Sequence, residues 1–156
     1  MKRALAVLLV IALILAGVAL WIVTHPPSDR DQILRLLDQV KEGVETNDVP
    51  KVMSCISQDY RDRYDLRKRD LTQLAFSVLY QQKGRFTLSM QPPAIEINGT
   101  LARVDLAAVT ISVAPKEGGA SQMLYQGPIV AQLHKEDGDW RIVSADGWQE
   151  TREFMP

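Results

Sequence analysis

The stretch KEDGDWRIVS, residues 135–144, decides the fold of this chain because it joins a turn signal to alternating side chains. Asp137-Gly138 is a dipeptide typical of a tight turn between two strands. Beyond the turn, Trp140 and Ile142 are two residues apart, so a strand would place both on one face, toward the core. We therefore predict a strand over 140–148, preceded by a partner strand over 123–135.

The segment before this hairpin shows the same period of two. Phe86, Leu88 and Met90 alternate with polar residues, and Ile95 and Ile97 resume the alternation after Pro92-Pro93. Asn98-Gly99 is a strong hairpin signal, and 101–114 is long and rich in β-branched residues. Gly127-Pro128, within the next strand, predicts a bulge or an edge. The pattern predicts a four-stranded antiparallel meander.

Three helical patterns precede the strands. Ser28, Asp48 and Asp70 are the residues expected to cap them, because their side chains can accept hydrogen bonds from free backbone N–H groups. Apolar residues recur at helical spacing after each cap, for example Leu71, Leu74, Ala75, Val78 and Leu79 after the third. We expect an α+β fold in which three N-terminal helices pack on one face of a curved four-stranded antiparallel sheet.

The first 24 residues have a different character. Residues 4–23 carry no charged or polar side chain and follow Lys2 and Arg3. Twenty helical residues cover roughly 30 Å, which matches a hydrocarbon core. We expect a single-pass anchor with a cytoplasmic N-terminus and an extracytoplasmic domain. The alternative is a signal peptide cleaved before Leu20, which would give a secreted protein. Residues 25–30 form a short linker.

Composition excludes some classes of function. Without Lys2 and Arg3 the chain has 16 basic and 19 acidic side chains. It therefore lacks the basic surplus that nucleic-acid-binding proteins normally carry, and this class is excluded. Cys55 cannot form an internal disulfide and has apolar neighbours, so we expect it to be buried. His25 and His134 are the only histidines and have no metal-ligand spacing. We expect no metal and no cofactor.

Three segments resemble the nuclear-transport-factor-2-like superfamily, the cystatin-like cone that includes ketosteroid isomerase and the SnoaL-like cyclases. They are VETND at 44–48, ISQDY at 56–60, which looks like the family's F-S-x-D-Y segment, and KEDGDWRIVS at 135–144. The resemblance implies one domain over 31–148, followed by a tail at 149–156. It also implies a pocket between sheet and helices, and a homodimer through the exposed sheet face.

Family enzymes place a carboxylate base shortly after the second helix, so the resemblance makes Asp62 and Asp65 candidates for a base. Asp105 is a third candidate if it faces the pocket, whereas pairing with Arg103 on the exposed face is the other outcome. The neighbouring arginines would hold Asp62 and Asp65 charged, which argues against a base. Aromatic side chains with a polar group commonly line small-molecule pockets. The candidate ligand-binding residues of this kind are Tyr60, Tyr64, Tyr125 and Trp148.

Two functions remain open. We expect a bacterial, membrane-anchored module that is not an enzyme and that binds a small apolar ligand in the cone or a partner protein through the sheet. The alternative is an isomerase-like or SnoaL-like enzyme with an aspartate as general base. The two differ in where the aspartates point, because a base must face the pocket and avoid the arginines.

Overall fold

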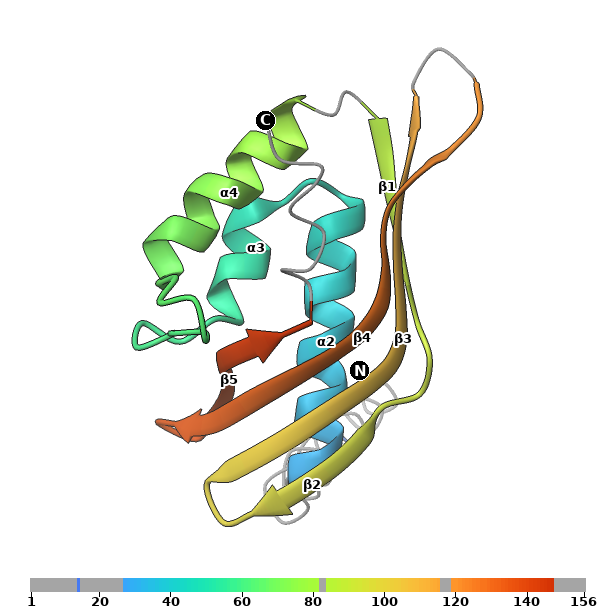
Figure 1. The fold of residues 1–156 in the computed structure, drawn as a ribbon. Helices are drawn as coiled ribbons and strands as arrows, with labels where there is room; N and C mark the ends of the chain where they lie inside the picture. Colours follow the sequence, from blue (N-terminus) through green and yellow to red (C-terminus); the bar gives the residue numbers. More distant parts are fainter. Residues whose placement is uncertain (1–13, 15–26, 82–83, 116–118, 148–156) are drawn as a thin grey trace, which may run out of the picture.

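The computed structural model describes Ile14 and residues 27–81, 84–115 and 119–147 (Figure 1). The expected anchor over residues 1–24, apart from Ile14, and the whole predicted tail at 149–156 lie outside the described residues. Among the residues described, no helix is both long and apolar enough to cross a membrane.

The first helix of the domain, α2, runs from Asp29 to Glu45. Ser28 caps it as predicted, because its hydroxyl accepts the backbone N–H of Asp31 and donates to the Asp31 carboxylate. Ile33, Leu36 and Leu37 are buried on one side of the helix. Figure 1 shows this helix lying against the concave side of the curved sheet, with α3 and α4 further out.

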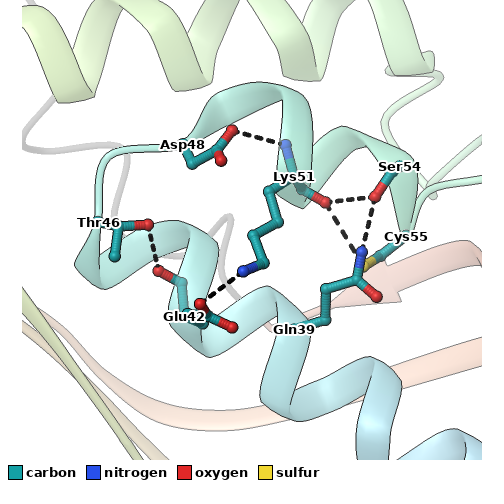
Figure 2. Close-up of polar contacts among 7 residues, drawn as sticks. All are labelled: Gln39, Glu42, Thr46, Asp48, Lys51, Ser54 and Cys55. Carbon is teal, nitrogen blue, oxygen red and sulfur yellow. Dashed lines mark hydrogen bonds and ion pairs between the residues drawn. The ribbon is translucent and has the colours of Figure 1, made fainter.

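The second helix, α3, runs from Val49 to Ser54 and begins at the predicted cap Asp48, which accepts the N–H of Lys51. Figure 2 shows how polar side chains join α2 to α3. Glu42 forms an ion pair with Lys51 at 2.6 Å, and the Gln39 amide donates to the Ser54 hydroxyl at 2.9 Å. Gly43 lets the two helices approach closely, because a Cβ there would lie 2.6 Å from Val52 Cγ2.

The third helix, α4, runs from Lys68 to Gln81 and corrects one prediction. Asp70 does not cap it but lies in its first turn, where its carboxylate accepts the backbone N–H of Arg67 at 2.9 Å. A carboxylate can satisfy a free N–H from either position, so sequence alone does not fix which residue starts the helix. Its Leu71 packs against the core.

The sheet is antiparallel and strongly curved, as predicted, but it has five strands rather than four. They are β1 (Gly84–Met90), β2 (Ala94–Asn98), β3 (Leu101–Pro115), β4 (Gln122–Glu136) and β5 (Asp139–Asp146). The order is β1-β3-β4-β5, and β2 also pairs with β3. Pro92-Pro93 separates β1 from β2, and both run along the same edge of β3. A proline has no N–H to donate to the ladder, which explains the break.

The turns and the bulge follow the local chemistry. Asp137 and Gly138 have positive φ and join β4 to β5 in the predicted tight turn. The β2–β3 turn is shifted by one residue from the Asn98-Gly99 prediction, because Asn98 pairs with Leu101 and Gly99-Thr100 form the loop. The predicted bulge is present, since the β3–β4 register shifts where β4 reaches Gly127-Pro128.

The core lies between α2 and the concave face of the sheet. Trp140 and Ile142 are both buried, as the alternation predicts, and Cys55 is 1% exposed. The backbone of Cys55 and Ser57 pairs with Ile142, so the segment after α3 closes the edge of β5. This places the polar loop at 57–67 beside the end of the sheet, next to the start of α4.

Candidate functional site

Asp62 is the buried aspartate of the polar loop, and it organises the loop backbone. Its side chain is 6% exposed, and its Oδ1 accepts the N–H groups of Tyr64 at 2.9 Å and Leu66 at 3.0 Å. Its own backbone N–H donates a hydrogen bond to the Leu66 carbonyl at 3.3 Å. These contacts give Asp62 a structural role at the base of the loop.

Asp65 and Asp105 are paired with arginines at the surface. Asp65 forms an ion pair with Arg61 at 2.7 Å, and both side chains are exposed. Asp105 accepts two hydrogen bonds from Arg103, at 2.9 and 2.8 Å, on the outer face of β3. These hydrogen bonds lower the pKa of Asp105 and raise that of Arg103. Of the two placements considered for Asp105, the structure therefore shows pairing on the exposed face.

The candidate aromatic residues do not share one environment. Tyr60 is 2% exposed and belongs to the core. Tyr125 is also buried, and its hydroxyl donates to the Pro128 carbonyl at 2.7 Å across the bulge. Tyr64 is exposed, with the Arg63 guanidinium 5.1 Å from its ring centroid. Trp148 lies outside the described residues. The structure thus brings Tyr60 and Tyr125 to the core and leaves Tyr64 at the surface.

A polar network at the end of the sheet was not predicted. The buried Ser57 hydroxyl donates to Glu136 at 2.6 Å, and the Lys68 ammonium donates to the Ile56 carbonyl at 2.8 Å. Burial lowers the pKa of Lys68, and the nearby charge of Arg141 lowers it further. The network joins the loop, α4 and the β4–β5 hairpin. No sequence spacing indicates it, because its members are up to 79 residues apart.

Two hollows lie on the surface near this network. One, of about 450 Å³, is lined by residues of the loop and the start of α4: Gln58, Arg67, Lys68, Arg69, Asp70 and Thr72. The other, of about 380 Å³, lies between α2 and the β4–β5 turn and includes Arg35, Trp140 and Arg141. Neither hollow is lined by the candidate aspartates or tyrosines. Among the residues described, no group of histidine, cysteine or acidic side chains could hold a metal ion.

The apolar side of α4 is only partly buried by the described residues. Leu74, Ala75 and Leu79 are only half-buried, and Val78 is 36% exposed. No side chain among residues 68–79 is buried. Figure 1 shows α4 at the outer side of the helical layer, beside α3. An amphipathic helix ordinarily buries its apolar stripe, so this one is incompletely covered by the described residues.

Comparison with known proteins identifies the fold. The sequence matches no family model and no curated protein. A solved structure of a protein of unknown function from Mycobacterium tuberculosis is similar, with 22% identity over 73% of this chain and 71% of that one and a TM-score of 0.61. A candidate scytalone dehydratase from Novosphingobium aromaticivorans gives 12% identity, 75% and 80% coverage and a TM-score of 0.65.

A third similar structure is a nuclear-transport-factor-2-like superfamily protein from Salmonella enterica, with 15% identity, 74% and 86% coverage and a TM-score of 0.60. Another, from Nostoc punctiforme, is described as having a cystatin-like fold. These likenesses support the predicted nuclear-transport-factor-2-like cone at the level of fold. At such low identity they say nothing about activity, because this fold carries both enzymes and other proteins.

Proposed function

We propose that this chain is a membrane-anchored module, not an enzyme, that binds a small apolar ligand along the apolar side of α4. Residues 4–23 would hold it in the membrane, with the domain on the extracytoplasmic side. The observation that carries the proposal is the apolar side of α4, which stays half-exposed on the outer side of the helical layer. An exposed apolar surface on a folded domain often marks a site that binds a ligand or a partner.

The placement of the aspartates supports a function other than catalysis. A general base must reach the substrate and have a pKa near the working pH. Asp65 and Asp105 are ion-paired with arginines, and the pKa of Asp105 is lowered, away from that range. Asp62 is buried, but its Oδ1 accepts two backbone N–H groups. The isomerase-like alternative would need one of these three to leave its present partners.

A homodimer through the outer face of the sheet remains part of the proposal. That face carries the Arg103–Asp105 pair, and Glu96 on β2 pairs with Arg103 in the register. Two copies would therefore meet through polar as well as apolar side chains. Sedimentation of residues 28–156 at several concentrations tests the dimer, and a monomer at every concentration would remove it.

The anchor is tested by extraction of membranes at alkaline pH. The full chain should stay in the membrane pellet, whereas a chain that begins at Ser28 should be soluble and folded. An insoluble or unfolded product from Ser28 onward would contradict the arrangement, because the domain would then need residues 1–27 to fold. Release of the full chain would contradict the anchor itself.

The ligand site is tested with the neutral apolar fluorophore N-phenyl-1-naphthylamine and two matched variants. Val78→Lys puts a charge on the apolar side of α4, and Gln73→Lys puts the same charge on an exposed residue of another side of the same helix. Losing the burial of one valine should weaken binding about tenfold. Gln73→Lys should bind as the unaltered chain does. Equal binding by both variants would refute a site on this side of α4.

A further inference from the structure

We infer that the ligand of the proposed function is an amphiphile whose oxyanion head group binds in the hollow at the start of α4. This inference rests on the proposed function, because it adds a head group to the apolar ligand placed along the same helix. We call this hollow of about 450 Å³ the basic hollow, and its lining residues are Gln58, Arg67, Lys68, Arg69, Asp70 and Thr72.

The basic hollow carries more positive than negative charge. Three of its six lining side chains are cations, Arg67, Lys68 and Arg69, and one is an anion, Asp70. The Asp70 carboxylate already accepts the backbone N–H of Arg67 at 2.9 Å. The excess stands out because the chain as a whole has a net charge of −1. An anion from outside the domain would therefore find an attractive site here.

The two arginines of the basic hollow are available to such an anion. Arg61 and Arg63, earlier in the same loop, each form an ion pair with an aspartate. Arg67 and Arg69 are exposed and form no ion pair with another described residue. A guanidinium presents a planar fork of N–H donors that matches two oxygens of a phosphate or carboxylate. Two such forks in one hollow favour an oxyanion as the ligand group.

Lys68 adds a partly desolvated cation to the same hollow. Its ammonium donates to the Ile56 carbonyl at 2.8 Å, which uses one of its three N–H donors. Burial lowers the pKa of Lys68, and the charge of Arg141 lowers it further. A bound oxyanion would favour the charged form of Lys68 and offset both effects.

The basic hollow continues into the apolar side of α4. Lys68 and Thr72 line the hollow and are one helical turn apart. Ala75 and Leu79, seven and eleven residues after Lys68, continue the same line of the helix and are half-buried. Phe76, one turn after Thr72, is 39% exposed. A head group in the hollow would therefore leave the apolar part of the same molecule beside apolar side chains.

The test compares two fluorophores that differ by one oxyanion group. 8-Anilinonaphthalene-1-sulfonate is N-phenyl-1-naphthylamine with an added sulfonate. Each is titrated into the full chain in phosphatidylcholine nanodiscs, and the signal of empty nanodiscs is subtracted. One variant combines Arg67→Gln with Arg69→Gln. The matched control combines Arg30→Gln with Arg85→Gln, which removes the same charge from exposed positions outside the basic hollow.

The unaltered chain should bind the sulfonate about tenfold more tightly than the neutral fluorophore. The variant at positions 67 and 69 should lose this preference and bind the neutral fluorophore as before, whereas the control should keep the preference. Equal affinity of the unaltered chain for both fluorophores overturns the inference and leaves the proposed function standing. Loss of the preference in both double variants also overturns it, because overall charge would then be the cause. Failure of both fluorophores to bind contradicts the proposed function as well.

Competition at constant ionic strength identifies the head group. Displacement of the sulfonate by phosphate at lower concentration than by acetate supports a phosphate head group, and the reverse order supports a carboxylate. Displacement by chloride as effective as by both oxyanions overturns the inference, because the hollow would then attract any anion without recognising its oxygens.

Discussion

Gly43→Ala is the substitution for which two opposing effects can be weighed most clearly. In the interior of a helix, alanine is favoured over glycine by about 1 kcal/mol, so propensity alone predicts stabilisation. At Gly43, however, the new Cβ would lie 2.6 Å from Val52 Cγ2, 3.1 Å from the Val52 nitrogen and 3.2 Å from the Asp48 carbonyl oxygen. Two of these three atoms belong to the backbone of α3 and its cap.

The steric effect should dominate. Valine has one strongly preferred χ1 rotamer in a helix, so the Val52 methyl cannot turn away cheaply, and the backbone atoms can move only if α3 shifts. Overpacking of this kind typically costs about 1–3 kcal/mol. Subtracting the gain in propensity, we expect Gly43→Ala to lower the free energy of unfolding by roughly 0–2 kcal/mol.

Urea unfolding of residues 28–156, followed by circular dichroism, measures this difference. The control is the double variant Gly43→Ala with Val52→Ala, which removes the methyl involved in the closest contact. The loss in the double variant should be smaller than the sum of the two single losses by about 1 kcal/mol. A Gly43→Ala chain that is more stable than the original would refute the close approach of α2 and α3.

Three further predictions concern single contacts. Ser57→Ala should lower the free energy of unfolding by about 1–2 kcal/mol, because the Glu136 carboxylate loses its 2.6 Å hydrogen bond, and an unchanged urea midpoint would exclude this. Lys135 and Trp140 donate to Asp29 and lower its pKa from the ordinary value of 3.8, so this carboxylate stabilises the fold above that pH and loses its effect as the pH falls through the lowered pKa. In acid titrations, Asp29→Asn should therefore destabilise the domain at pH 7 and make little difference at the acid limit. Burial raises the pKa of Cys55, so Ellman's reagent should label it slowly in the folded domain and at once in urea, and rapid labelling of the folded domain would contradict its burial.

Much of the fold could be predicted from local signals. Ser28 and Asp48 cap their helices because a short polar side chain satisfies a free N–H only a few residues away. Asp137-Gly138 forms its turn because both residues accept positive φ. Asp70 was misplaced because its carboxylate acts equally well from within the first turn, and the strand before Asn98 was counted once because the alternation continues across Pro92-Pro93.

The site was less predictable because its contacts join distant parts of the chain. The Ser57–Glu136 bond and the Asp29–Trp140 bond link residues 79 and 111 positions apart. No periodic pattern shows such pairs. For Asp105, the parity of the buried Ala102 and Val104 fixes the outer face, so the strand pattern contained the answer once the core side was known. Tyr60 lies in the loop after α3, outside the alternating segments, so no strand pattern predicts its burial.

Native mass spectrometry of residues 28–156, purified without residues 1–27, tests the central claim most directly. It reports the mass of any bound small molecule and the number of subunits in one experiment. The proposed function predicts a bound apolar molecule that is retained in Gln73→Lys and lost in Val78→Lys. An empty protein, even after incubation with membrane lipid extract and N-phenyl-1-naphthylamine, would contradict a ligand site beside α4.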